Sequence, residues 1–242
     1  MAKFRTLDDL DDVTGKVALI RVDLNLPMAE GRASDLTRVQ AVAPTILELA
    51  DAGAKVLLLA HFGRPKGERR STMSLSYVQG DVERVLGREI MFISEVSGPV
   101  VEQSLGILRN GDIGLLENTR FWHGEEANDP EFARAIAAHG DFYVNDAFSA
   151  AHRAHASTEG LAHILPAYAG RAMEKELKAL DAALGSPQTP VAAVVGGAKV
   201  STKLAVLGNL VGKADHLIAS ARTLNGMGRL TRAVGKAIAM VF

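Results

Sequence analysis

The sequence contains no cysteine, which excludes disulfides, thiolate metal ligands and cysteine nucleophiles. It also lacks any apolar run long enough to span a membrane, and its first ten residues lack the apolar segment of a signal peptide. Charge of one sign is not in excess, since 27 basic side chains balance 28 acidic ones for a net charge of −1. We therefore expect a cytoplasmic protein with no membrane partner and no nucleic-acid partner.

The chain does have enough apolar residues for a core, because 48% of its 242 residues are hydrophobic. Its length allows one large domain or two small ones. Short, almost continuous apolar runs are typical of parallel strands that are covered on both faces. Such runs occupy Lys16–Val22, Lys55–Ala60, Ile90–Ile93, Ile113–Leu116, Phe142–Val144 and Val191–Val195.

Helical patterns separate these runs. They cover Leu36–Ala52 (capped by Asp35), Ser74–Leu86, Pro99–Leu108, Pro130–Ala138, Arg171–Leu184 and Val200–Val211. The alternation predicts an α/β fold: a doubly wound, Rossmann-like parallel sheet, then a connecting helix and an incomplete second α/β domain. The predicted domains are 1–170, 171–186 (helix and hinge) and 187–242, the last with an unassigned tail at 219–242.

Polar and cationic side chains follow the predicted strands. In open α/β sheets, ligands bind beyond the carboxyl ends of the strands, so these side chains are expected to share one edge. Arginine offers a planar fork that fits phosphate and carboxylate oxygens, and Asp or Asn can bind ligand hydroxyl groups. The predicted anion site consists of Asp23, Asn25, Arg38, His61, Arg64, Arg120 and Arg153.

Each of these residues also has a plainer interpretation. A single arginine after a strand is usually a solvated loop residue, and His61 alone could be a hydrogen-bonded structural histidine. His152 and His155 have the spacing of a metal pair, but no third ligand is evident, so we predict no metal ligand in the chain. The number of candidates at strand and helix ends favours a binding site.

A second candidate site follows the run at 191–195. Gly196 and Gly197 would let the backbone approach a phosphate, and Lys199 and Lys203 lie four residues apart at the start of the predicted helix. The segment is not a Walker A loop. Taken alone, it fits a tight turn with exposed lysines equally well.

Six ordered segments together resemble the phosphoglycerate kinase family. They are Arg21–Pro27 (RVDLNLP), His61–Lys66 (HFGRPK), Leu116–Phe121 (LENTRF), Asn145–Ser157 (NDAFSAAHRAHAS), Met173–Leu177 (MEKEL) and Gly196–Lys203 (GGAKVSTK). One departure is Phe62, where the family usually has leucine. The resemblance runs from the N-terminus to about Ile218.

The resemblance implies a glycolytic kinase that transfers a phosphoryl group reversibly between 1,3-bisphosphoglycerate with ADP and 3-phosphoglycerate with ATP. It implies that the predicted anion site in 1–170 binds the phosphoglycerate. Gly196, Gly197, Lys199 and Lys203 would face the nucleotide phosphates, and Mg²⁺ would enter with the nucleotide. Because the attacking group is already a carboxylate, catalysis reduces to positioning and charge neutralisation, with Arg38 and Lys199 as candidates for stabilising the transferring group.

The tail at 219–242 does not resemble the family. It carries four basic residues and no acidic ones, which would suit a basic interfacial helix, but three glycines and weak periodicity favour a disrupted reading frame. We therefore expect an incomplete nucleotide site, and the family resemblance implies a monomer. The alternatives are a non-catalytic module that binds 3-phosphoglycerate and an unrelated α/β sugar-phosphate enzyme.

Overall fold

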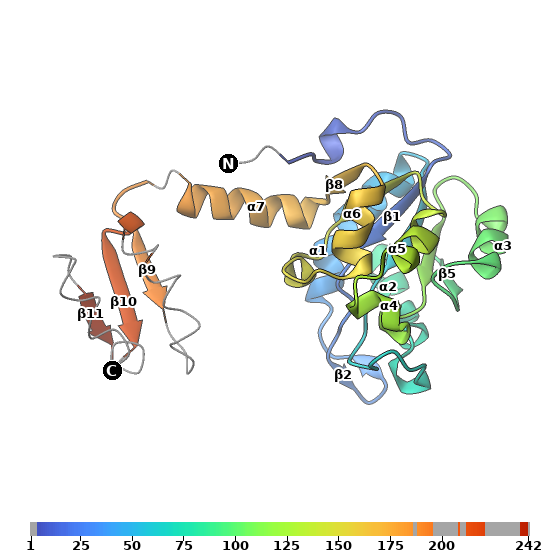
Figure 1. Cartoon of the computed structure of the whole chain (residues 1–242), viewed down its shortest axis with the longest axis horizontal. Coiled ribbons are helices and arrows are strands. Elements are labelled where there is room, and N and C mark those ends of the chain that lie inside the picture. The colour runs from blue at the N-terminus through green and yellow to red at the C-terminus, as the bar shows by residue number, and fades with distance from the viewer. Residues whose placement is uncertain (1–3, 186–187, 196–207, 209–211, 221–237, 242) are drawn as a thin grey trace. The chain divides into compact units, whose positions relative to one another are not determined.

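The structure is a computed structural model that describes residues 4–185, 188–195, 208, 212–220 and 238–241 (Figure 1). The chain divides into two compact units, Ala2–Glu176 and Leu177–Phe242. This division falls inside the helix that the sequence assigns to the connection between domains. The predicted domain limits of 1–170, 171–186 and 187–242 stay a prediction.

The first unit is built on a six-stranded sheet in which every pair of neighbours is parallel. The strand order is β5-β6-β4-β1-β7-β8. The predicted α/β fold is thereby confirmed. The strands are β1 (Val17–Arg21), β4 (Lys55–Leu59), β5 (Ile90–Ile93), β6 (Ile113–Leu116), β7 (Phe142–Asn145) and β8 (Ala167–Ala169).

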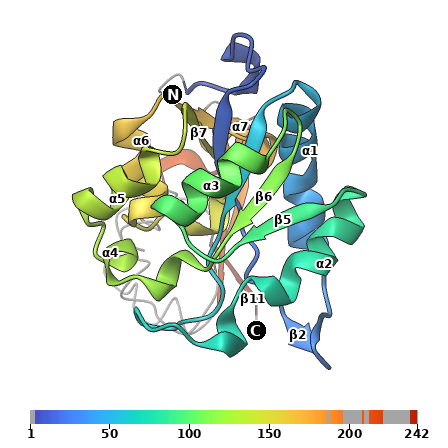
Figure 2. The ribbon, with the colours of Figure 1, turned by 90° about the vertical axis from the view of Figure 1, so that its right-hand side faces the viewer.

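Helices cover both faces of this sheet, as the doubly wound class requires (Figure 2). The α-helices assigned within the described residues are α1 (Thr37–Asp51), α2 (Ser76–Leu86), α3 (Pro99–Ile107), α4 (His123–Glu126), α5 (Pro130–Ala137), α6 (Leu161–Ile164) and α7 (Arg171–Leu184). Short helical turns are η1 (Leu7–Asp9), η2 (Ser71–Met73), η3 (Thr119–Phe121), η4 (Phe148–Ala150) and the π-helical η5 (Ala156–Gly160).

Two separate clusters of buried side chains fill the space between the sheet and its helices. Because side chains alternate along a strand, Ile20 packs with the α1 and α2 side chains whereas its neighbour Leu19 packs with those of α3, α5 and α6. Both residues are fully buried. Burial on both faces explains why these strands appear in the sequence as continuous apolar runs.

Three short strands of the first unit were not predicted. β8 has only three residues (AYA), which are too few to stand out as an apolar run. A two-stranded antiparallel hairpin of β2 (Met28–Ala29) and β3 (Arg32–Ala33) precedes α1. Its turn contains Glu30 and Gly31, both with positive φ. Strands of two or three residues carry too little periodicity to be read from one sequence.

Helix α7 begins and ends at the residues predicted from its Glu and Lys spacing. Its first turn is fixed to the sheet by Asp146, whose Oδ1 accepts a hydrogen bond of 2.9 Å from the Met173 amide. Arg171 forms ion pairs with Asp8, Glu48 and Glu174. The start of α7 is therefore fixed to the first unit, close to the end of β7.

The described part of the second unit contains, besides the end of α7, a parallel sheet of β9 (Ala192–Val195), β10 (His216–Ser220) and β11 (Ile238–Val241), in the order β11-β10-β9. β9 confirms the predicted run at 191–195. Residues 238–241 are extended and pair with β10, so an interfacial helix through the end of the tail is wrong for these four residues. The predicted helix Val200–Val211 lies outside the described residues, apart from Gly208. Among the described helices, none is long and apolar enough to cross a membrane.

Candidate functional site

The strand order creates one place where a ligand crevice is expected. From β1 the chain continues to its neighbour β4, toward one edge of the sheet. From β7 it continues to its neighbour β8, toward the opposite edge. The carboxyl ends of β1 and β7 therefore lie at a topological switch point, where connections diverge and open α/β sheets bind their ligands. Asp23 follows β1 and Ser149 follows β7. The Ser149 hydroxyl donates to Asp23 Oδ2 across this point.

Asp23 is the centre of a first group of predicted residues. Arg38 Nη1 lies 3.1 Å from Asp23 Oδ1 and 3.0 Å from Oδ2, and it also donates to the Asn25 carbonyl oxygen at 3.0 Å. Burial opposes ionisation of Asp23, but hydrogen bonds from Ser149 and the Asn25 amide, with the charge of Arg38, hold its pKa below its usual value. Asp23 is therefore an anion that orients Arg38.

Asn25 joins this group to the loop after β4. Its Oδ1 accepts a hydrogen bond of 2.9 Å from the Gly63 amide. The carbonyl oxygen of Gly63 in turn accepts one of 2.9 Å from Arg120 Nη1. A single chain of contacts thus links the ends of β1, β4 and β6.

Arg120 is a buried cation, with only 5% of its surface exposed. Burial is the main cause that lowers its pKa. Its Nε lies 3.2 Å from Glu126 Oε1, close enough for an ion pair but without the geometry of a hydrogen bond. The Arg120 guanidinium is thus held between the Gly63 carbonyl oxygen and the Glu126 carboxylate at the end of β6.

The loop after β4 packs against the segment that contains Arg120, and this contact favours glycine at position 67. Gly67 has a φ of +80°, and its amide donates to the Arg120 carbonyl oxygen at 3.1 Å. A Cβ atom at Gly67 would lie 2.2 Å from His123 Nδ1. The conformation and the close approach both favour glycine, which fixes the loop that carries His61 and Arg64.

His61 is buried at the end of β4, and its ring is neutral at physiological pH. Its pKa is lowered to about 3, first by burial and then by the charges of Arg21 and Arg120. Arg21 Nη2 lies 2.9 Å from His61 Nδ1. At neutral pH His61 can therefore act as a hydrogen-bond donor or acceptor but not as a cation.

The last two predicted residues are less tightly held. Arg153 is half-buried, its Nε lies 3.4 Å from His152 Nε2, and its charge is near enough to lower the pKa of His61. Arg64 is exposed on the loop after His61. The structure thus brings Asp23, Asn25, Arg38, His61 and Arg120 together by contacts or charge and places Arg153 beside them.

Sequence reasoning did not select Arg21, Glu125 and Ser157, which lie directly behind the predicted site. Arg21 is the last residue of β1 and is only 1% exposed. An ionised residue inside an otherwise apolar buried strand is the signal that could have found it, because a charge is buried only with partners. No comparable signal marks Glu125 or Ser157, which come from α4 and η5.

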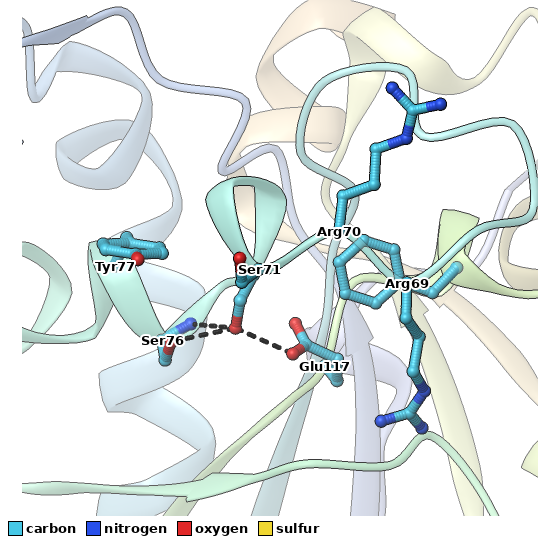
Figure 3. A pocket seen from close by; sticks show the side chains of 8 residues that line it. Arg69, Arg70, Ser71, Ser76, Tyr77 and Glu117 are labelled. Carbon is cyan, nitrogen blue, oxygen red and sulfur yellow. Dashed lines mark hydrogen bonds between the residues drawn. The ribbon is translucent and has the colours of Figure 1, made fainter.

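A separate pocket of about 380 Å³ lies beside the end of β6 and the start of α2 (Figure 3). Its buried Glu117 accepts hydrogen bonds from the Ser74 hydroxyl at 2.7 Å and the Leu75 amide at 2.9 Å. The residues that line it include none of the predicted anion site; they are Arg69, Arg70, Ser71, Ser74, Ser76, Tyr77, Glu117 and Phe121.

The second predicted site, with Gly196, Gly197, Lys199 and Lys203, lies outside the described residues. Its proposed contacts with nucleotide phosphates stay a prediction.

The fold and the geometry at the switch point define a doubly wound α/β protein with a cluster of polar and cationic side chains at one sheet edge. A family model described as phosphoglycerate kinase matches residues 7–227. The chain belongs to the phosphoglycerate kinase family. The match reaches nine residues beyond Ile218, where the resemblance was predicted to end (227 against 218).

Individual relatives agree with this assignment. The chain is 67% identical over 218 residues to a phosphoglycerate kinase from Sphingopyxis alaskensis, covering 90% of this chain and 55% of that protein. It is 62% identical over 215 residues to one from Zymomonas mobilis, covering 89% and 54%. The solved phosphoglycerate kinase of Coxiella burnetii superposes with a TM-score of 0.81 at 37% identity, covering 90% and 55%. The chain thus spans about half the length of the relatives it matches.

Proposed function

We propose that the strand-end cluster binds 3-phosphoglycerate or 1,3-bisphosphoglycerate as the acid-substrate site of a phosphoglycerate kinase. The observation that carries this proposal is the convergence of Arg38, Arg120 and Arg153 on a switch point in a chain of this family. The phosphate and carboxylate of the ligand are both anions, and arginine forks match both. Asp23 and Asn25 are suited to the hydroxyl group between them.

The protonation states of the site fit phosphoryl transfer to a carboxylate. Such an acceptor is already ionised and needs no general base, and His61, with a pKa of about 3, is a poor proton acceptor at neutral pH. The proposed reaction is reversible transfer between 1,3-bisphosphoglycerate with ADP and 3-phosphoglycerate with ATP. Arg38 would neutralise the transferring group.

The nucleotide side of the proposal rests on the resemblance of the Gly196–Lys203 segment. Gly196 and Gly197 would admit the phosphates, and Lys199 and Lys203 would neutralise them, with Mg²⁺ arriving on ATP or ADP. The second candidate function is binding of the acid without transfer. It is favoured by the observation that every contact of the described cluster lies within one unit, Ala2–Glu176.

Calorimetry and an activity assay on the full chain test both candidates. We expect saturable binding of 3-phosphoglycerate and at least about tenfold weaker binding of glycerol 3-phosphate, which lacks the carboxylate but keeps the phosphate. Phosphoryl transfer with Mg-ATP would reject the binding-only candidate, whereas acid binding without transfer would favour it. Absence of 3-phosphoglycerate binding by a chain whose circular dichroism shows it folded would overturn the proposed acid site.

A further inference from the structure

Arg21 raises a problem of buried charge. Its guanidinium is 1% exposed and cannot lose its proton, so it needs a counter-charge within the structure. Its Nε donates a hydrogen bond of 2.9 Å to the Ser157 hydroxyl oxygen, and its Nη1 donates to the Val22 carbonyl oxygen. Of these two acceptors, Ser157 is the one that leads on to an anion.

Ser157 connects Arg21 to a carboxylate that is itself fully buried. The Ser157 hydroxyl donates to Glu125 Oε1 at 2.6 Å, and the Ser157 amide donates to Glu125 Oε2 at 2.9 Å. Glu125 is 0% exposed. The Tyr143 hydroxyl holds the Ser157 carbonyl oxygen at 2.9 Å. A serine that accepts from the cation and donates to the anion is a directional relay between two buried charges.

The other end of this relay fixes the proton on His61. An arginine has no acceptor atom, so the contact of 2.9 Å between Arg21 Nη2 and His61 Nδ1 requires Nδ1 to accept. Nδ1 then carries no proton, and the neutral ring must carry its single proton on Nε2. Nε2–H is the only ring donor left for a ligand.

The backbone conformation around Ser157 indicates that its contacts with Glu125 are a specific feature of the fold. It lies on the π-helical turn η5, where three successive amides, those of Thr158, Glu159 and Gly160, donate to the His155 carbonyl oxygen. Single π-turns are uncommon and occur often at functional sites. In this turn the Ser157 amide and hydroxyl are both directed at Glu125.

We propose that Glu125 and Ser157 are positioning residues that act through Arg21 to hold His61 as the Nε2–H tautomer, a neutral donor to the acid ligand. The ligand part of this inference rests on the proposed function. Neither Glu125 nor Ser157 needs to touch the ligand. Their effect is to keep a buried cation in one place and thereby to choose which ring nitrogen of His61 is a donor.

Ring nitrogen spectra of the full chain, labelled with ¹⁵N-histidine, test this directly. We expect the unmodified chain to show His61 protonated on Nε2 and not on Nδ1. Ser157→Ala breaks the relay while leaving the Glu125 carboxylate in place. We expect a measurable fraction of the Nδ1–H tautomer and about tenfold weaker 3-phosphoglycerate binding in this variant. Glu125→Gln, which removes the charge and keeps the shape, is expected to act in the same direction.

Ser74→Ala is the matched control, because Ser74 also donates to a buried glutamate, Glu117, at 2.7 Å in the same unit. It should leave the His61 tautomer unchanged. A His61 ring protonated on Nδ1 in the unmodified chain would overturn the proposal. So would Ser157→Ala and Glu125→Gln variants that lose stability but keep both the tautomer and the affinity. The expected tautomer in a chain that does not bind 3-phosphoglycerate would refute the proposed function and leave the relay standing.

Discussion

Arg120→Met is expected to weaken 3-phosphoglycerate binding by about a hundredfold. Arg120 is buried at the end of β6, so its charge acts on a ligand with little screening by water. Methionine removes both the charge and the bond of 2.9 Å to the Gly63 carbonyl oxygen, which helps to hold the β4 loop. The affinity is best measured by calorimetry at a temperature where thermal scans show each variant to be folded.

Two further variants separate charge from geometry. Arg120→Lys keeps the charge but loses the planar fork. We expect its affinity for 3-phosphoglycerate to be about tenfold below that of the native chain and above that of the methionine variant. Arg134→Met removes an exposed arginine of α5 that pairs with Glu131, and it should leave the affinity unchanged. An Arg120→Met variant that binds within about threefold of the native chain would contradict the proposed role of this guanidinium.

The second large effect is a loss of stability in mild acid that depends on His61. Its pKa is about 3 in the folded chain against an ordinary value of 6.5, so between these values only the unfolded chain takes up the proton. Above pH 6.5, His61 therefore does not lower the free energy of unfolding. As the pH drops toward 3, protonation of His61 in the unfolded chain lowers this free energy progressively. Between neutral pH and about pH 4, His61 should contribute a loss on the order of 3 kcal/mol.

His61→Gln isolates this contribution. The glutamine oxygen can still accept from Arg21 but cannot titrate, so the variant should show a flatter loss of stability between about pH 7 and pH 4 in urea unfolding. Other groups respond to acid as well: Asp23 has a lowered pKa, whereas burial raises the pKa of Asp146. Comparing the variant with the native chain at each pH removes the contributions of these groups, because both proteins contain them. His163→Gln, at an exposed position on α6, is the control. Equal pH dependence in the native and His61→Gln chains would contradict the neutral, buried His61.

Much of the first unit could be predicted because its determinants are local. The buried strands are continuous apolar runs, and α7 carries its Glu and Lys residues at helical spacing. The anion site followed from one general rule, that the carboxyl ends of parallel strands share an edge. That rule places Asp23, His61 and Arg120 in one region without knowledge of the strand order. The resemblance to phosphoglycerate kinase supplied the expected ligand.

The relay behind the site could not be predicted in this way. Arg21 and Ser157 are 136 positions apart, and Ser157 and Glu125 are 32 apart, so neither pairing has a signal in periodicity or spacing. Their partnership arises only when η5 packs against α4 and β1. Short elements such as β8 were missed for a different reason, since three residues define neither an apolar run nor an alternation.

An amide-shift titration of the ¹⁵N-labelled full chain with 3-phosphoglycerate tests most directly whether the strand ends form the acid site. We expect saturable shifts at the carboxyl ends of β1, β4, β6 and β7, including the amides of Asp23, Gly63 and Arg120. Glycerol 3-phosphate should shift a subset of these amides at higher concentrations. Saturable shifts confined to the pocket lined by Ser71 and Tyr77, or no saturable shifts in a folded chain, would contradict the assignment of the acid site.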